Sequence, residues 1–205
     1  MSRIKICGLS RSEDIIYVNE AKPDYAGFII NFPRSHRNID VQTLKELKQT
    51  LNPDIKAVGV FVDQPVELVA GIAQAGLIEL IQLHGKEDEN YIRRLRIHTG
   101  VRIIKAFQIT SPEDMKAVEK SSADYVLLDA GQGSGKTFDW QFLADVERPY
   151  FLAGGISADN IEAAMNIAKP FALDVSSGVE TDKIKDKKKM MEVVRIAHKE
   201  EKYYE

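Results

Sequence analysis

The sequence is poor in cysteine, in long apolar runs and in excess positive charge, and each shortage excludes a class of protein. Cys7 is the only cysteine among 205 residues, so the chain can form neither an internal disulfide nor a metal site of clustered cysteines. No apolar run approaches the roughly 18 residues of a membrane span, and the apolar part of MSRIKICGLS is too short for a signal peptide. A net charge of −3 and an isoelectric point near 5.9 argue against a nucleic acid or a membrane surface as partner. We therefore expect a cytoplasmic protein.

The remaining composition is that of an ordinary globular protein. Hydrophobic residues make up 44% of the chain and charged residues 29%, which is typical of a folded protein with a substantial core. A length of 205 residues is ample for one domain and short for two. We therefore expect residues 1–205 to form a single domain.

Short β-rich runs alternate with amphipathic stretches along the whole chain. Most of these runs are almost continuously apolar, as expected of parallel strands buried on both faces. They cover residues 3–8, 25–31, 57–63, 80–85, 102–109, 125–130, 150–155 and 172–178. Helices are predicted over 65–76, from about 111 and about 157, and over the tail 183–200, where Lys187 to Lys189 are expected on a solvated face. Eight such units predict an α/β fold of the closed (β/α)8 barrel type, and a doubly wound open sheet is the alternative.

Polar residues and glycines gather where the predicted strands end. In both candidate folds ligands bind at the carboxyl ends of the strands. The polar residues and glycines at the ends of the predicted strands are Cys7, Asn31, Asp63, His84, Gln108, Asp129, Gly154–Gly155 and Asp174–Ser177. We expect these positions to converge on one mouth although they lie far apart in the sequence.

Residues 130–137, AGQGSGKT, satisfy the loose form of a nucleotide-binding P-loop with Lys136 as its lysine. A P-loop begins a helix at that lysine, whereas the following TFDW is a poor first helical turn. Phosphate sites in barrels are commonly built from the loops after the seventh and eighth strands. We therefore predict a phosphate ligand held by backbone groups near Gly154, Gly155, Ser177 and Gly178, with Gly133 contributing from the glycine-rich loop. A plain flexible connection is the alternative for that loop.

Seven segments, taken in order, resemble one enzyme family. They are KICGLS (5–10), NFPRSHR (31–37), VGVFVD (58–63), QLHG (82–85), LLDAGQGSGKTFDW (127–140), LAGGISADN (152–160) and DVSSGVE (174–180). Together they resemble phosphoribosylanthranilate isomerase, a (β/α)8 enzyme of tryptophan biosynthesis. The chain departs from the family pattern in its glycine-rich loop, in LAGGISADN (152–160), where the family has LAGGL-x-P-x-N, and at Lys183, where the family usually has glycine.

The resemblance implies an Amadori rearrangement of a phosphorylated small-molecule substrate, with Cys7 as general base and Asp129 as general acid. The acid protonates the furanose ring oxygen and the base removes the proton from C2′, so Asp129 must hold its proton and Cys7 must lose its own. Opposite demands of this kind are typical of acid/base pairs. The alternative for a lone cysteine is small apolar packing.

Four further side chains are candidates for substrate binding. Arg37 suits the anthranilate carboxylate because guanidinium and carboxylate form a bidentate pair, and Arg34 is a weaker candidate. His84 contacts substrate or orients a neighbour, and Asp174 binds sugar hydroxyls or caps a turn. We expect no metal and no cofactor, and either a monomer or a homodimer. A barrel enzyme acting on the related aminoimidazole ribotide is a second candidate, but its expected carboxylate pair would need an acid in place of Cys7.

Overall fold

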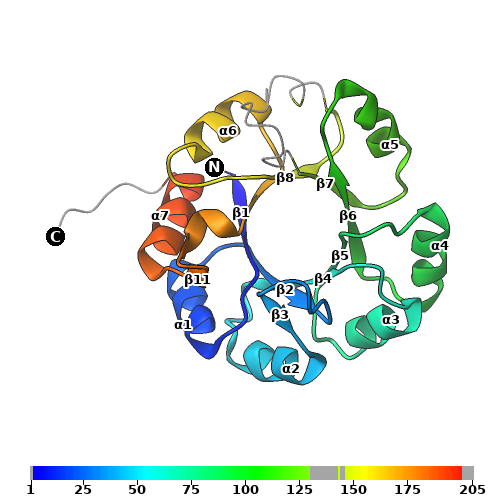
Figure 1. The fold of residues 1–205 in the computed structure, drawn as a ribbon, viewed down its shortest axis with the longest axis horizontal. Coiled ribbons are helices and arrows are strands. Elements are labelled where there is room, and N and C mark those ends of the chain that lie inside the picture. Colours follow the sequence, from blue (N-terminus) through cyan, green and yellow to red (C-terminus); the bar gives the residue numbers. More distant parts are fainter. Residues whose placement is uncertain (1, 130–142, 144–145, 200–205) are drawn as a thin grey trace.

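The computed structural model describes residues 2–129, 143 and 146–199. Its main sheet is a ring of parallel strands closed by the pairing of β1 with both β2 and β9 (Figure 1). The eight barrel strands are β1 (Arg3–Cys7), β2 (Tyr25–Ile30), β4 (Lys56–Phe61), β5 (Leu80–Leu83), β6 (Arg102–Gln108), β7 (Tyr125–Asp129), β8 (Tyr150–Ala153) and β9 (Ala172–Val175). Each lies inside one of the eight predicted runs or within one residue of it. The closed barrel is confirmed, and the doubly wound sheet is wrong.

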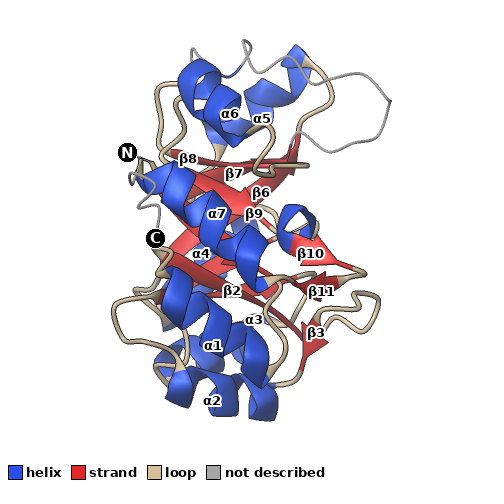
Figure 2. Ribbon diagram, turned by 90° about the vertical axis from the view of Figure 1, so that its left-hand side faces the viewer, coloured by secondary structure: helices blue, strands red, loops and turns tan. Residues whose placement is uncertain are grey.

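Helices surround the barrel because each buries one apolar face against the strands. They are α1 (Ser12–Ala21), α2 (Val41–Thr50), α3 (Val66–Gln74), α4 (Glu89–His98), α5 (Met115–Lys120), α6 (Ile161–Ala168) and α7 (Lys187–His198). Helix α5 follows a short 3₁₀ turn, η1 (Pro112–Asp114), in which the Asp114 carboxylate accepts hydrogen bonds from the backbone of Thr110 and Ser111. Figure 2 shows α1 and α7 side by side on one flank of the barrel.

The tail differs from the prediction of a helix over 183–200, because α7 begins only at Lys187. Asp186 accepts hydrogen bonds from the backbone N–H groups of Lys188 and Lys189, which makes it the residue that caps the helix. Before it, β10 (Glu180–Thr181) and β11 (Ile184–Lys185) form an antiparallel hairpin. Lys183 stands in the turn of this hairpin with φ of 64°, a left-handed conformation that favours glycine.

Two apolar clusters fill the fold. The larger one lies between the strands and the surrounding helices. The smaller one fills the barrel interior and includes Tyr25, Val58, Leu80, Ile104 and Phe151, with the Tyr25 and Phe151 rings in edge contact at 5.4 Å. Within the described ranges no helix is long and apolar enough to cross a membrane. The single-domain assignment for residues 1–205 stays a prediction, because residues 130–142, 144–145 and 200–205 lie outside the described part.

Another short strand, β3 (Asn38–Ile39), pairs with the end of β2 and was not predicted. Figure 2 places β3 at the same end of the barrel as the β10–β11 hairpin. Both additions lie around the mouth formed by the carboxyl ends of the strands. They therefore shape the candidate site rather than the barrel itself.

Candidate active site

A cavity of about 430 Å³ opens at the carboxyl ends of the barrel strands. It gathers most of the predicted site residues: Cys7, Arg37, His84, Asp129, Gly154, Gly155, Asp174 and Ser177. Gly133 and Lys136 lie outside the described residues. Three strand-end residues, Asn31, Asp63 and Gln108, are not among the described residues that line the cavity, and neither is Arg34. The first group is therefore confirmed to line one cavity, whereas Asn31, Asp63 and Gln108 stand at strand ends without lining it.

Local backbone geometry explains two of these exceptions. Asn31, directly after β2, and Asp63, two residues after β4, adopt left-handed conformations with φ of 53° and 51°, so the chain changes direction there. The Asp63 carboxylate consequently accepts a hydrogen bond from the backbone N–H of Lys86 at 2.6 Å and supports the neighbouring loop.

Cys7 lies at the end of β1 and is buried. Burial raises the pKa of its thiol, and the Lys5 ammonium on the same strand opposes that change. The next strand approaches closely here, because a Cβ on Gly27 would lie 2.8 Å from the Cys7 sulfur and 2.9 Å from Cε of Lys5. Only glycine at this position leaves both side chains room to share the barrel interior.

Lys5 is fully buried inside the barrel, whereas Arg3 is exposed and stacks on the Phe171 ring at 4.4 Å. The Lys5 ammonium donates to Asp174 Oδ2 and to Gln82 Oε1, both at 2.8 Å. Burial alone would lower the pKa of Lys5, but Asp174 and Cys7 outweigh it and raise that pKa, so Lys5 is charged. The other oxygen of Asp174, Oδ1, is buried at the cavity and has no hydrogen-bond partner among the residues that the structure describes.

His84 and Asp129 face each other across the ends of β5 and β7. His84 Nε2 lies 3.9 Å from Asp129 Oδ2, and the side chains are 37% and 32% exposed. His84 Nδ1 lies 2.9 Å from Gln82 Nε2. Burial lowers the pKa of His84, although Asp129 opposes this, so the imidazole is neutral around pH 7.

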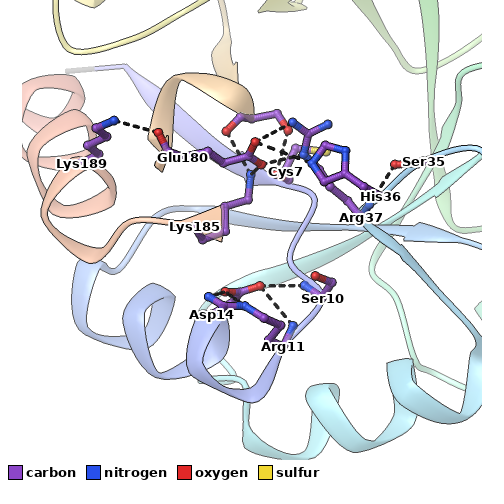
Figure 3. A network of polar contacts seen from close by, with 11 residues as sticks. Cys7, Ser10, Arg11, Asp14, Ser35, His36, Arg37, Glu180, Lys185 and Lys189 are labelled. Carbon is purple, nitrogen blue, oxygen red and sulfur yellow. Dashed lines mark hydrogen bonds and ion pairs between the residues drawn. The ribbon is translucent and has the colours of Figure 1, made fainter. Parts of the chain in front are cut away.

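Arg37 forms a bidentate ion pair with Glu180 (Figure 3), with Nε and Nη2 at 2.6 and 2.7 Å from the two carboxylate oxygens. Lys185 donates to Glu180 Oε1 at 2.7 Å and to the carbonyl oxygen of Ser176 at 3.0 Å. Burial alone would raise the pKa of Glu180, but hydrogen bonds from Arg37 and Lys185 outweigh it and lower that pKa to about 2. Burial lowers the pKa of Lys185.

Sequence reasoning missed Glu180 and Lys185 as site residues. Lys185 was expected on the tail helix, yet it is 4% exposed and lies in the hairpin beside the cavity. The sequence feature that could have indicated these two residues is the DVSSGVE segment, because it ends in Glu180 and Lys185 follows five residues later.

Two glycine-containing loops follow β8 and β9. Gly154 and Gly155 have φ of 99° and 70°, values that glycine adopts without strain. The Asn160 side chain holds the first loop by donating to the carbonyl oxygen of Gly155 and accepting from the backbone of Ser157, both at 2.9 Å. A Cβ on Gly178 would collide with the carbonyl oxygen of Ile156, so the two loops are in direct contact.

The closed barrel and the cavity at its strand ends, lined by Cys7, His84, Asp129 and Asp174, define an enzyme of the (β/α)8-barrel class. The family model described as N-(5′-phosphoribosyl)anthranilate (PRA) isomerase matches residues 4–196. The chain therefore belongs to the phosphoribosylanthranilate isomerase family and is an isomerase of tryptophan biosynthesis, which confirms the resemblance seen in the sequence.

Individual members of the family match this chain along almost its whole length. The N-(5′-phosphoribosyl)anthranilate isomerase of Endomicrobium trichonymphae is 42% identical over 201 residues, covering 96% of this chain and 98% of the relative. The crystal structure of the Thermotoga maritima phosphoribosyl anthranilate isomerase superposes with a TM-score of 0.87 at 32% identity, covering 97% and 100%. A further isomerase structure, in complex with reduced 1-(o-carboxyphenylamino)-1-deoxyribulose 5-phosphate, has a TM-score of 0.85 at 31% identity, with the same coverage. These matches set aside the nucleotide-binding and aminoimidazole ribotide alternatives.

Proposed function

We propose that this cavity converts N-(5-phosphoribosyl)anthranilate into 1-(2-carboxyphenylamino)-1-deoxyribulose 5-phosphate by an Amadori rearrangement. Asp129 protonates the furanose ring oxygen, which opens the ring to a Schiff base. Cys7 then takes the proton from C2′, and the resulting enolamine becomes the ketose. The observation that carries this proposal is that Cys7 and Asp129, from β1 and β7, line one cavity.

The surroundings of Cys7 suit a general base. Thiolate formation is opposed by burial and favoured by two buried ammonium groups, those of Lys5 and Lys185. A base whose proton affinity is raised by burial removes a carbon-bound proton more effectively once it is ionised. The neighbouring cations are therefore what keeps the ionised form accessible.

Substrate binding is proposed from complementary chemistry around the cavity. Asp174 Oδ1, which is buried and has no partner within the described part of the chain, suits a sugar hydroxyl as donor. The guanidinium of Arg37 lines the cavity and suits the anthranilate carboxylate, with Glu180 holding it in place through Nε and Nη2. The apolar side chains of Phe32 and Val60 line the same cavity and suit the aromatic ring.

The phosphate is proposed to bind at the loops after β8 and β9, near Gly154, Gly155, Ser177 and Gly178, with Gly133 assigned by sequence alone. The left-handed glycines let the backbone approach an anion closely. The isomerase relative in complex holds a ligand with a 5-phosphate and a carboxyphenylamino group, the two anionic ends that this arrangement would accommodate.

The rearrangement as proposed needs no metal or cofactor, since both proton transfers are assigned to side chains. Among the described residues, no group of three or more His, Cys, Asp or Glu side chains is placed to hold a metal ion. We propose a cytoplasmic enzyme that is a monomer or a homodimer. A phosphoribosylanthranilate isomerase relative from Thermotoga maritima is dimeric, and monomers of it have been crystallised.

Turnover of freshly generated phosphoribosylanthranilate, followed by the change in anthranilate fluorescence, tests the proposal. The wild type should convert substrate, and Cys7→Ser and Asp129→Asn should each lower kcat by about 10²- to 10⁴-fold, the range for losing a positioned acid or base. Cys7→Ser and Asp129→Asn are both close to isosteric, so unchanged circular dichroism is expected for both. If a folded variant kept the wild-type kcat, the residue changed in it would not be the acid or base of the reaction.

A further inference from the structure

A line of polar contacts leads from the strand of the proposed base to the proposed acid. Lys5 Nζ lies 2.8 Å from Gln82 Oε1, and Gln82 Nε2 lies 2.9 Å from His84 Nδ1. His84 Nε2 lies 3.9 Å from Asp129 Oδ2. Gln82 has no part in the mechanism proposed above, yet its buried hydrogen bond with Lys5 joins β5 to β1.

The chemistry of the ammonium group decides the orientation of the Gln82 amide. A lysine ammonium donates hydrogen bonds and accepts none, so the Gln82 atom that faces Lys5 must be the carbonyl oxygen. Exchanging the amide oxygen and nitrogen would set two donors against each other where both side chains are shielded from water. The NH₂ group of Gln82 therefore faces His84.

The same argument decides which nitrogen of His84 carries the proton. The NH₂ group of Gln82 only donates, so Nδ1 must present its lone pair. The imidazole is neutral, because burial lowers the pKa of His84 and Lys5 and Lys105 lower it further, against the opposing charges of Asp129 and Asp174. A neutral imidazole holds a single ring proton, which then lies on Nε2, the nitrogen nearest Asp129.

We infer that Lys5, acting through Gln82, is a positioning residue that sets the Nε2–H tautomer of His84 and so directs an N–H donor at Asp129. This inference rests on the proposed acid role of Asp129. When Asp129 gives its proton to the ring oxygen it becomes a carboxylate, and a neutral N–H donor stabilises that charge. The other tautomer would present a lone pair to it. The distance of 3.9 Å is too long for a hydrogen bond, and such catalytic contacts tighten when substrate binds.

The test combines histidine ¹⁵N NMR with kinetics on the full chain. Two-bond ¹H–¹⁵N correlations distinguish the two neutral tautomers and the imidazolium, and His84→Gln assigns the His84 signal among the four histidines. In the wild type the signal should be that of the Nε2–H tautomer. Gln82→Glu keeps an acceptor for Lys5 but replaces the NH₂ donor by an oxygen, so Nδ1 should gain a proton.

Gln82→Glu should lower kcat by about 10- to 100-fold, the range for losing a hydrogen bond to a charged group. If the imidazole stays neutral, its lone pair faces Asp129, and if it becomes an imidazolium, it holds Asp129 as the carboxylate and removes the acid. Gln74→Glu is the matched control, because Gln74 is exposed on α3 and its amide donates to the backbone of His98. Gln74→Glu should keep wild-type kcat.

Either of two results would overturn the inference: an Nδ1–H tautomer in the wild type, or a Gln82→Glu enzyme with the kcat of the Gln74→Glu control. Gln82→Met, which removes both hydrogen bonds at similar volume, replaces Gln82→Glu if the latter does not fold. The wild-type NMR result needs no variant to fold. A wild type with the Nε2–H tautomer but no turnover would instead refute the proposed function, so the two failures are distinguishable.

Discussion

Replacing Glu180 by glutamine should cost the enzyme a defined, pH-dependent part of its stability. Glu180 is 6% exposed and joins Arg37 to Lys185 (Figure 3). Burial alone would raise its pKa, but these two cations lower it from 4.5 to about 2. That difference corresponds to about 3 kcal/mol at neutral pH. Because the pKa of Lys185 is lowered by burial, part of this gain is offset, and we expect a loss of about 2–3 kcal/mol.

The sign of the pH dependence follows from the lowered pKa. The contribution of Glu180 is fully present above its unfolded pKa of about 4.5 and is lost as the pH falls toward about 2. Glutamine resembles the protonated glutamate, so the stability difference between wild type and Glu180→Gln should shrink across this interval. Urea unfolding, followed by far-ultraviolet circular dichroism at a series of pH values between 7 and 3, measures it.

Glu67→Gln is the matched control, since Glu67 pairs with Arg94 at 3.4 Å on the surface and both side chains are more than half exposed. An exposed pair of this kind contributes at most about 1 kcal/mol. The reasoning would be refuted if Glu180→Gln lowered the free energy of unfolding by no more than Glu67→Gln does. It would also be refuted if the decrease caused by Glu180→Gln were the same at pH 6 and pH 3.

Burial raises the pKa of Cys7 above its ordinary value of 9.0, against the opposing charge of Lys5, so kcat/KM should rise with pH up to and beyond pH 9 as the thiolate forms. A pH–rate profile that levels off near pH 7 would contradict this. Gly178→Ala should raise KM for the phosphorylated substrate and destabilise the fold by at least about 1 kcal/mol, because its methyl group would collide with the Ile156 carbonyl oxygen. Gly71→Ala, in open space on α3, should instead stabilise by about 0.5–1 kcal/mol in the same thermal or urea assay. Lys183→Gly should stabilise the fold by roughly 0.5–1 kcal/mol, because φ of 64° is strained for lysine. Unchanged or lower stability of this variant would show that lysine adopts this φ in the hairpin without strain.

The barrel was predictable because strands buried on both faces leave an almost continuous apolar run. Residues near the carboxyl ends of such runs lie close to the mouth of the barrel, which is why Cys7 and Asp129 could be placed at the cavity from their positions alone. Asn31 and Asp63 do not line the cavity, since a left-handed conformation at or just beyond the strand end changes the direction of the side chain. Dihedral angles of this kind leave no periodic signal in the sequence.

The hairpin beside the cavity was not predictable for a different reason. Its two strands are two residues long, too short to show alternation, and Lys185 stands in a lysine-rich stretch typical of a solvated helix. What draws Lys185 inward is Glu180, and this contact forms only once the chain folds back. The inward direction of Lys5 also depends on distant partners, since Gln82 and Asp174 stand 77 and 169 residues away.

The most direct test of the central claim, rearrangement by proton transfer in this cavity, is the isotopic composition of the product made in D₂O. The proton that Cys7 takes from C2′ exchanges with solvent at the thiol, and C1′ is then protonated from solvent. The account predicts that wild-type enzyme yields a product with solvent deuterium at C1′, beyond that of preformed product left in D₂O without enzyme. A folded protein that converts no substrate, or a product without deuterium at C1′ together with undiminished turnover by Cys7→Ser, would contradict the account.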